Sequence, residues 1–476
     1  MQSITDKLSF LFYQWSGVQP EIIIPLPPSG SERHYWRISN GNRSAIGAWN
    51  PVVEENEAFL SFTLHFHRKG LHVPAIYGID KAREAYLIED LGDRSLFFIM
   101  EKMPEDKVVL DEIISLYKKS LTELISFQVI AGRDIDYKKC YPYSAFDPRS
   151  MKWDLNYFKY YFLKLHVPFH EGKLEDDFDT LINYLGQADS TFFMYRDFQA
   201  RNILIKNDQP YFIDYQGGRK GPLQYDVASL LFQVKADLPF ESRDELLDYY
   251  ISQLSAVITV DRAAFKKLYY GFVLIRLLQV LGAYGFRGLI EKKPHFLASI
   301  PFALKNLRWW LNHVDLQLNL PELKQALEKL AGLEQYKPAE TPSHAGILAI
   351  VIKSFSYKHG IPDDFSGHGG GFVFDCRALP NPGREERYRA FNGKDQVIID
   401  FLQDKLEVIS FMKDTEKIVS QSVDNYLARG FNSLVVNFGC TGGQHRSVYC
   451  AETLATRLLQ KYPQVKIEIS HLMSNI

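Results

Sequence analysis

Hydrophobic and polar positions first mark off an N-terminal region of mixed periodicity, from residue 1 to about 105. One stretch, Glu54–Lys69, repeats its apolar residues with helical spacing and is closed by Gly70 and Pro74. Short runs of β-branched and aromatic residues predict strands at Glu21–Ile24, Tyr35–Ile38, Ser44–Trp49 and Tyr86–Glu89. The pattern therefore predicts a sheet accompanied by one helix.

The region from 106 to about 333 is dominated by long helical patterns, such as Val108–Val129 and Ala263–Leu281. Its most apolar segment, Tyr269–Phe286, has about the minimum length of a membrane-spanning helix, but Arg276 and Gln279 interrupt it. Because such side chains are rare inside a bilayer, we expect a buried helix of a helical lobe and no membrane contact.

A change of composition separates a third region. Proline and small residues concentrate at 334–345, which predicts an interdomain linker. Residues 346–476 then alternate strand-like and helical patterns, which is typical of a small α/β domain with a mainly parallel sheet. The strand-like runs are Gly346–Phe355, Gly371–Cys376, Ser433–Phe438 and Val465–Ile469.

Composition narrows the class of protein. The chain has 476 residues, 46% of them hydrophobic and 24% charged, which is ordinary for a globular protein of two or three domains. Its four cysteines form no C-x-x-C pair and are too few for a disulfide framework. A net charge of −2 excludes wholesale electrostatic attachment to nucleic acid or membrane. The N-terminus lacks the pattern of a signal peptide, so we expect a cytoplasmic protein.

The richest chemical segment is Tyr195-Arg-Asp-Phe-Gln-Ala-Arg-Asn-Ile-Leu204, which a second aspartate, Asp214, follows after a short apolar run. Asp197 at a loop tip can orient an acceptor hydroxyl and take its proton. Asn202 returns to the same loop and, with Asp214, can hold Mg²⁺ against the phosphates of ATP. Phosphoryl transfer requires positioning and neutralised charge, and these residues supply both.

This segment and the following G-P-L-Q-Y-D-V-A-S-L resemble the aminoglycoside/choline kinase-like phosphotransferases, and within them the anomeric sugar kinases of cell-wall recycling (AmgK-like). The resemblance implies a bilobal α+β protein-kinase-like fold, with an N-lobe at 1–105 and a helical C-lobe at 106–333. It also implies ATP and Mg²⁺ as cofactors. The implied acceptor is an amino sugar of the N-acetylmuramate or N-acetylglucosamine type.

The resemblance extends to the N-terminal region. Ser29-Gly30-Ser31-Glu-Arg33-His-Tyr-Trp-Arg37 is similar to the family's nucleotide loop, and Glu89-Asp-Leu91 to its adenine-binding hinge. One departure stands out, because Arg43–Trp49 offers no lysine for the phosphates. Arg33, Arg37 or Arg43 could supply that charge or could be ordinary strand residues. We name Glu57 as the candidate helix glutamate.

A second site is predicted near the C-terminus, where Gly439-Cys-Thr-Gly-Gly-Gln-His-Arg446 joins a strand to a helix. Glycines between a strand and a helix N-terminus expose N–H groups to an anion, and the helix dipole favours negative charge. Gly442 and Gly443 permit the backbone to approach an anion closely, and His445 and Arg446 can add charge-assisted hydrogen bonds.

Two functions remain open for this loop. Cys440 and Arg446 fit the C-x5-R pattern of cysteine phosphatases. Alternatively, this loop, the segment containing Lys358 and His359, and the segment containing Arg377 resemble in order the C-terminal domain of the RNase adapter protein RapZ. That resemblance implies binding of a small RNA or an amino-sugar phosphate, and it allows oligomerisation through this domain. The matching positions expected to line the anion site are Lys358, His359, Arg377, Cys440, Thr441, Gly442, Gly443, Gln444, His445, Arg446 and Ser447.

Charge bears on the choice between RNA and metabolite. From residue 341 onward there are 15 Lys and Arg against 14 Asp and Glu, whereas nucleic-acid modules are usually markedly basic. We therefore favour an ATP-dependent sugar phosphotransferase whose C-terminal domain binds a phosphorylated metabolite or RNA. The alternatives are an RNA-binding regulatory adapter with a degenerate kinase domain, and a C-terminal cysteine phosphatase.

Overall fold

The computed structural model describes residues 4–27, 33–101, 107–333, 336, 348–362 and 371–473. The predicted loop residues Ser29, Gly30 and Ser31, and all of the predicted linker except Tyr336, lie outside these ranges. The chain divides into two compact units. The first comprises Met1–Glu291 and Ser299–Tyr336, and the second comprises Lys292–Ala298 and Lys337–Ile476.

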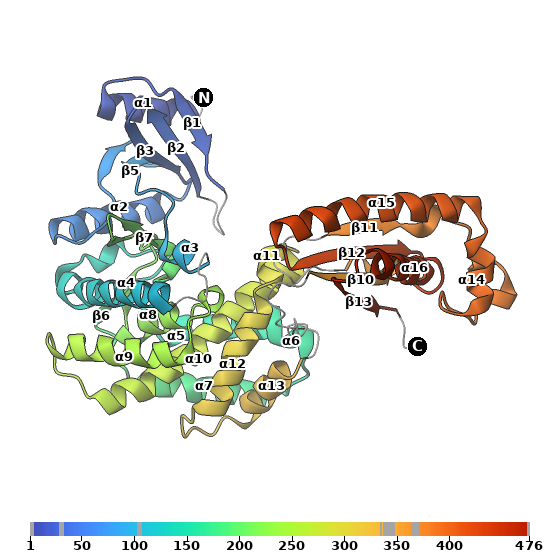
Figure 1. The fold of residues 1–476 in the computed structure, drawn as a ribbon. Coiled ribbons are helices and arrows are strands. Elements are labelled where there is room, and N and C mark those ends of the chain that lie inside the picture. Colours follow the sequence, from blue (N-terminus) through green and yellow to red (C-terminus); the bar gives the residue numbers. More distant parts are fainter. Residues whose placement is uncertain are drawn as a thin grey trace. The chain divides into compact units, whose positions relative to one another are not determined.

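The first unit begins with a five-stranded antiparallel sheet in the order β1-β2-β3-β5-β4 (Figure 1). Its strands are β1 (Ile22–Pro25), β2 (His34–Asn40), β3 (Arg43–Trp49), β4 (Ile76–Ile79) and β5 (Ala85–Glu89). Helix α1 (Ile4–Ser16), which our sequence analysis missed, buries Leu8, Leu11 and Phe12 against this sheet. The prediction of one helix in this region was therefore wrong.

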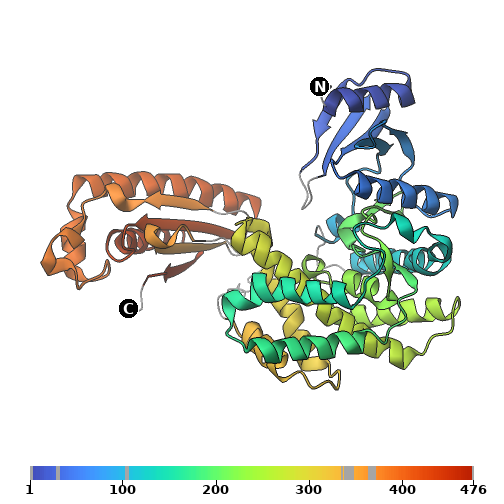
Figure 2. The same cartoon turned by 180° about the vertical axis from the view of Figure 1, so that it is seen from behind.

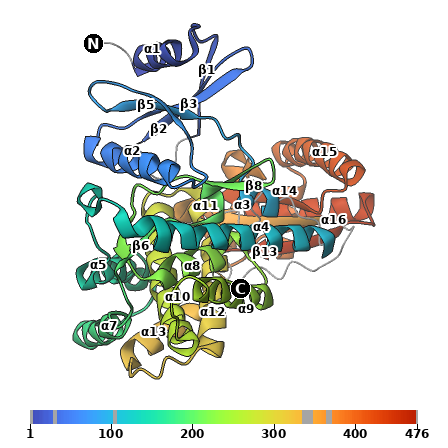
Figure 3. The same cartoon turned by 90° about the vertical axis from the view of Figure 1, so that its left-hand side faces the viewer.

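Helix α2 (Val53–Arg68) lies between this sheet and α4 in Figures 1 and 3. Aromatic rings connect it to both sides. Phe59 stacks on Tyr86 of the sheet, with ring centroids 5.1 Å apart, while Phe66 meets Phe127 edge-on at 4.7 Å. Such aromatic pairs stabilise packing beyond the area they bury. The helix therefore couples the sheet to the helices below it.

The rest of the first unit is a helical lobe (Figure 2) that contains two two-stranded antiparallel sheets. One sheet pairs β6 (Phe192–Met194) with β9 (Arg219–Gly221), and the other is a hairpin of β7 (Ile203–Lys206) and β8 (Gln209–Phe212). The helices are α3 (Leu96–Glu101), α4 (Lys107–Ile125), α5 (Pro148–Phe158), α6 (Lys164–His166), α7 (Glu171–Leu185), α8 (Leu223–Leu231), α9 (Phe240–Ser255), α10 (Arg262–Tyr284), α12 (Ile300–His313) and α13 (Pro321–Ala331).

Helix α10 contains the apolar segment that was expected to be buried. Among the described residues, only Arg262–Ile290 is long and apolar enough to cross a membrane by length and composition, and 56% of its most apolar window is buried inside the protein. Glycines allow close packing at its end: a Cβ at Gly285 would lie 2.0 Å from the Tyr161 carbonyl oxygen. The helix therefore packs directly on the backbone that follows α5.

The second unit is built on a four-stranded parallel sheet in the order β11-β12-β10-β13. Its strands are β10 (Ala349–Ser356), β11 (Phe372–Asp375), β12 (Ser433–Cys440) and β13 (Lys466–His471). Its helices are α11 (Pro294–Leu297), α14 (Gln396–Gln403), α15 (Leu406–Arg429) and α16 (Arg446–Lys461). The parallel sheet confirms the predicted α/β domain, and α16 begins directly beyond the glycine-rich loop that ends β12.

Candidate active site

The predicted catalytic loop connects β6 to β7 and carries Asp197 and Asn202. β7 turns back through β8, and the Ile213 N–H donates to the Asn202 carbonyl at 3.1 Å. The hairpin therefore returns Asp214 to the loop. The Asn202 Nδ2 donates to Asp214 Oδ2 at 3.1 Å and to the Asp197 backbone carbonyl at 2.9 Å. The structure thus brings together the three residues predicted for base and metal.

Asp214 is a buried carboxylate beside a second carboxylate. Burial, and then the nearby negative charge of Asp197, raise the pKa of Asp214, although a hydrogen bond at 2.7 Å from Gln216 Nε2 opposes the shift. The Oδ1 of Asn202 accepts no hydrogen bond from any described residue. These residues fit a divalent cation, because its charge would offset the repulsion between Asp197 and Asp214. The cation could also take the Asn202 Oδ1 and an Asp214 carboxylate oxygen as ligands.

The described residues offer no metal site that is richer in ligands than this one. They contain no group of three or more His, Cys, Asp and Glu side chains placed to hold a metal. Mg²⁺ commonly uses one or two carboxylates and takes its remaining ligands from water and substrate phosphates. Asp214 and Asn202 therefore match the type of site that needs a nucleotide to be complete.

Two residues of this site hold a left-handed backbone. Arg196 has a φ of +78° and Asp214 a φ of +71°, and such values are costly for residues other than glycine. Tyr215 helps to fix the second: its hydroxyl lies 2.6 Å from Thr63 Oγ1 on α2, and its ring stacks on Phe59. Strain of this kind persists only where surrounding contacts impose it, and it concentrates at functional sites.

Asp226 on α8 imposes the conformation before Asp197. Its carboxylate accepts the backbone N–H groups of Tyr195 at 2.8 Å and Arg196 at 2.9 Å, and also the side-chain amide of Gln128 at 2.9 Å. Burial outweighs these donors and raises the pKa of Asp226 to about 7. This carboxylate supports the loop and does not face the reacting groups.

The side chain of Arg196 is fixed by hydrogen bonds and by aromatic rings. Its guanidinium donates to both oxygens of Asp154 on α5, at 2.9 and 2.8 Å, and to the Tyr225 hydroxyl at 2.6 Å. Its Cζ lies 5.0 Å from the ring centroids of both Phe146 and Tyr225. A bidentate pair between two aromatic rings fixes orientation as well as charge. Arg196 and Asp154 therefore neutralise each other and brace the residue that precedes Asp197.

Of the three arginines that the sequence left open, Arg33 is the buried one. Its guanidinium lies 3.1 Å from Glu55 Oε1 on α2 and donates to the Tyr35 hydroxyl at 3.3 Å. Burial opposes its charge, but Tyr86, Tyr35 and Glu55 outweigh that effect and raise the pKa of Arg33. Its positive charge also opposes the rise in the pKa of Asp214.

The predicted helix glutamate, Glu57, does not pair with Arg33. It forms an ion pair with Arg83, whereas Glu55 takes the position beside Arg33. The two glutamates are two positions apart on α2, so they lie on different faces of the helix. Arg43 is an exposed residue at the start of β3.

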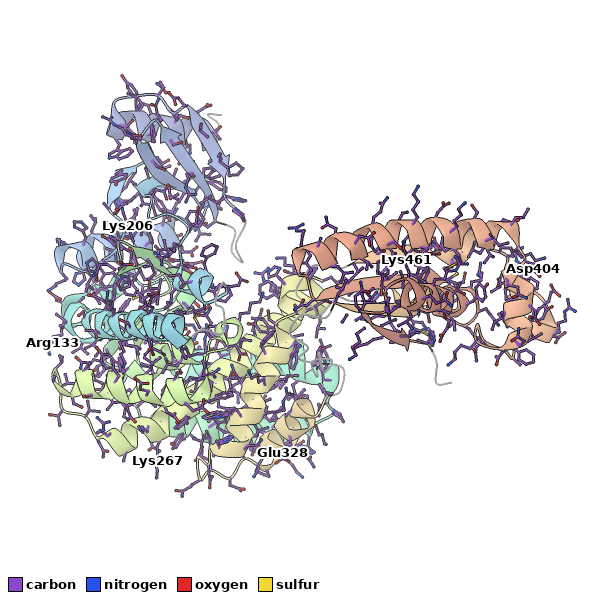
Figure 4. All side chains as sticks on the ribbon, in the orientation of Figure 1. Arg133, Lys206, Lys267, Glu328, Asp404 and Lys461 are labelled. Carbon is purple, nitrogen blue, oxygen red and sulfur yellow. The ribbon has the colours of Figure 1, made fainter. Side chains whose placement is uncertain are left out.

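Arg37 forms ion pairs with the segment predicted as the adenine hinge. It donates to Asp90 at 2.8 and 3.2 Å and to Asp93 at 2.8 Å through each of two nitrogens. Glu89 forms an ion pair at 2.6 Å with Lys206 of β7, which Figure 4 labels. Leu91 is buried between these charged positions. The segment is therefore tied to β2 on one side and to the helical lobe on the other.

A second residue set surrounds the glycine-rich loop of the second unit. A cavity of about 280 Å³ lies at the N-terminus of α16. It is lined by Asn381, Gly383, Arg389, Cys440, Thr441, Gly442, Gln444, His445 and Arg446. The Cys440 Sγ accepts the Gly443 N–H at 3.2 Å and lies 3.2 Å from Ser447 Oγ, so the loop folds around the sulfur.

Arg446 is the buried charge of this cavity. Its Nη1 donates to the backbone carbonyls of Arg377 at 2.8 Å and Leu379 at 3.1 Å, while its Nε is buried without a hydrogen-bond partner among the described residues. A buried guanidinium N–H without an acceptor costs folding free energy, and an anion in the cavity would accept the hydrogen bond of the Arg446 Nε.

The other predicted residues of this site divide into two groups. Gln444 and His445 line the cavity, yet their side chains also hold backbone carbonyls: Gln444 those of Arg389 and Phe391, and His445 that of Tyr388. The remaining residues do not line this cavity: Lys358, His359, Arg377, Gly443 and Ser447.

Comparison with known proteins assigns both units. Residues 24–266 match the model of the phosphotransferase enzyme family, and residues 348–474 match that of the RapZ C-terminal domain. The chain belongs to the phosphotransferase enzyme family. This confirms the resemblances found in the sequence and, with the lobes described above, the predicted kinase-like fold.

Individual relatives cover parts of the chain. A nucleotide-binding protein of Dichelobacter nodosus is 41% identical over 129 residues, which are 27% of this chain and 44% of that protein. One of Dechloromonas aromatica is 46% identical over 108 residues, which are 23% of this chain and 37% of that protein. The chain thus spans less than half the length of these curated relatives.

The chain is also similar to solved structures at low sequence identity. Choline kinase of Cryptosporidium parvum is 12% identical with a TM-score of 0.46, covering 68% of this chain and 99% of its own. Amicoumacin kinase in complex with AMP-PNP and Ca²⁺ is 13% identical with a TM-score of 0.40, covering 67% and 91%.

The raised pKa of Asp226 predicts a pH dependence of stability. The native carboxyl keeps a proton that the unfolded chain releases, so its stabilising contribution is complete below about pH 4 and is lost as the pH rises through about 7. Asp226→Asn cannot ionise and lacks this loss. The melting temperature of the wild type, minus that of Asp226→Asn, should therefore fall between pH 5 and pH 8.

Asp179→Asn, at an exposed position on α7, serves as the control. Its melting temperature should change with pH in parallel with that of the wild type between pH 5 and pH 8. Parallel curves for wild type and Asp226→Asn would contradict the assigned pKa.

Proposed function

We propose that the first unit is an ATP- and Mg²⁺-dependent kinase for a small hydroxylated acceptor, an amino sugar of the N-acetylmuramate or N-acetylglucosamine type, in the cytoplasm. The observation that carries the proposal is the convergence of Asp197, Asn202 and Asp214 on one face of a braced loop. Membership of the phosphotransferase family supports the reaction class. The sugar class rests on the sequence resemblance.

In this mechanism Asp197 takes the proton of the acceptor hydroxyl as that oxygen attacks the γ-phosphoryl group. Its side chain is 40% exposed, so an acceptor can reach it. Asp214 and Asn202 would hold Mg²⁺, which neutralises the developing charge on the phosphates. Asp226 and Asp154 keep the loop in place while the proton moves.

Arg33 and Glu55 take the part that a strand lysine and a helix glutamate play in other kinases. The pair joins the start of β2 to α2, and the buried Arg33 places a fixed positive charge within electrostatic reach of Asp214. Since Arg37 is engaged by Asp90 and Asp93, it would position the hinge and not the phosphates.

Replacement of the base tests the reaction directly. Asp197→Asn keeps the shape of the side chain but cannot accept the proton, so kcat for ATP-dependent sugar phosphorylation should fall by at least about 100-fold. Product formation from a sugar panel should be followed by mass spectrometry. Asp179→Asn is the matched control. Sugar-dependent turnover that survives in Asp197→Asn would defeat the assignment.

The role of Arg33 is tested by a comparison of arginines. Arg33→Gln should lower kcat/KM for ATP by about 10- to 100-fold, because it removes a charge-assisted contact to the phosphates. Arg33→Lys should recover part of that loss, and the exposed Arg43→Gln should stay within about twofold of the wild type. Equal kinetics for Arg33→Gln and Arg43→Gln would sink this role.

For the second unit we propose binding of a phosphorylated metabolite at the cavity before α16. The unpartnered Arg446 Nε, the glycine-rich loop and the helix N-terminus together favour an anion there. RNA binding, an adapter role and oligomerisation through this unit stay as alternatives implied by the RapZ match. For phosphatase chemistry, Cys440 would have to be accessible, yet its side chain is only 3% exposed.

Calorimetry with amino-sugar phosphates tests this site. The wild type should bind at least one of them, and Arg446→Ala should abolish the heat. Arg446→Lys keeps a positive charge and should retain weak binding, while Arg457→Ala, a partly exposed position on the same helix that does not line the cavity, should bind like the wild type. Absence of binding across the panel would count against the site. Hydrolysis of an aryl phosphate that depends on Cys440 would favour the phosphatase.

A further inference from the structure

The cavity before α16 has a second arginine at its rim. Arg389 lines this cavity together with the buried Arg446, and it was not among the residues predicted for the site. Its Nε donates a long hydrogen bond, 3.4 Å, to the carbonyl oxygen of Gly383, which lines the same cavity. Arg389 is also an exposed residue. Its guanidinium is therefore accessible to a ligand that enters the cavity from solvent.

Hydrogen bonds fix the backbone that carries Arg389 to the glycine-rich loop. The side-chain amide of Gln444 donates to the carbonyl oxygens of Arg389 at 3.1 Å and Phe391 at 2.7 Å. The Nε2 of His445 lies 3.0 Å from the Tyr388 carbonyl oxygen. The position of Arg389 relative to the loop is therefore set before a ligand binds, which lowers the entropy cost of binding.

Arg389 has no carboxylate within ion-pairing distance among the described residues, which distinguishes it from two neighbouring arginines. Arg377 forms an ion pair with Asp375 at 2.7 Å. Arg387 forms one with Glu385, also at 2.7 Å. A cation that no local carboxylate engages is available to an anionic group of a ligand.

The two guanidiniums of the cavity are placed differently. Arg446 is 5% exposed, and its Nη1 donates to the backbone carbonyls of Arg377 and Leu379, which leaves its buried Nε for an anion beside the glycine-rich loop. Arg389 lies at the exposed rim. The cavity of about 280 Å³ is close in size to pockets for small organic ligands, and none of its lining residues is acidic. It can therefore hold a ligand larger than one phosphate group.

We propose that this cavity binds a sugar derivative with two anionic groups, one at Arg446 beside the glycine-rich loop and the other at Arg389 at the rim. The inference rests on the proposed binding of a phosphorylated metabolite and specifies its ligand class. Sugar bisphosphates and phosphorylated sugar acids share this chemistry. A guanidinium suits both, because it can form two parallel hydrogen bonds with a phosphate or with a carboxylate.

Calorimetry of the full chain with three related sugars tests this class. Glucose 6-phosphate carries one anionic group, 6-phosphogluconate adds a carboxylate, and glucose 1,6-bisphosphate adds a second phosphate. At least one of the two doubly anionic ligands should bind at least about tenfold more tightly than glucose 6-phosphate, the usual effect of one charge-assisted contact. The comparison between these two ligands identifies the second anionic group.

Variants of the two arginines separate their roles. Arg389→Gln should remove the advantage of the doubly anionic ligand and leave the affinity for glucose 6-phosphate within about twofold of the wild type. Arg389→Lys should retain part of the advantage, whereas Arg446→Ala should abolish binding of all three ligands. Arg387→Gln removes an equal charge two positions away, which Glu385 already engages, and should bind like the wild type.

Three results would overturn the inference. The first is that neither doubly anionic ligand binds more tightly to the wild type than glucose 6-phosphate does. The second is a loss of all binding in Arg389→Gln, which would place both arginines on one phosphate. The third is an equal effect of Arg387→Gln and Arg389→Gln, which would indicate long-range charge alone. Failure of the proposed function has a different signature, because the wild type would then bind none of these ligands and no amino-sugar phosphate.

Discussion

The first unit depends on holding two carboxylates, Asp197 and Asp214, beside each other in a partly buried site. Burial, and then the negative charge of Asp197, raise the pKa of Asp214. The chain holds them there with two left-handed residues, Arg196 and Asp214, whose backbone is fixed by Asp226 and by aromatic packing. The proposed Mg²⁺ would offset the unfavourable charge of the Asp214 carboxylate.

The sheet of the first unit joins this site through ionic and aromatic contacts. Tyr215, which follows Asp214, packs on α2, and α2 also presents Glu55 to Arg33. The same helix therefore contacts both the proposed metal-binding segment and the proposed phosphate-binding charge. In the proposed kinase, Arg33 directly before β2, paired with Glu55 of α2, would supply the fixed positive charge near the phosphates in place of a lysine on β3.

Much of this could be predicted because local sequence decides it. The runs that became β2, β3 and β5 are β-branched and aromatic, α2 has clear helical spacing, and the loop from Asp197 to Asp214 carries its chemistry in one segment. The parallel sheet of the second unit followed from the alternation of strands and helices.

The parts that were missed depend on tertiary contacts. Helix α1 is short, and only its packing on the sheet distinguishes Leu8, Leu11 and Phe12 from a loose apolar run. The choice of Glu55 over Glu57 depends on which face of α2 meets Arg33. Arg276 did leave a signal, since it interrupts an apolar helix, but its partner Asp197 lies 79 positions earlier in the chain and only the fold brings the two together.

The most direct test is a crystal structure of the full chain with Mn²⁺ and a non-hydrolysable ATP analogue, in which anomalous scattering locates the metal. The account predicts a peak within bonding distance of an Asp214 carboxylate oxygen, Asn202 Oδ1 and phosphate oxygens, with Asp197 facing the γ-phosphate from outside the coordination shell. A metal bound elsewhere, or a nucleotide whose phosphates do not reach Asp214, would contradict it.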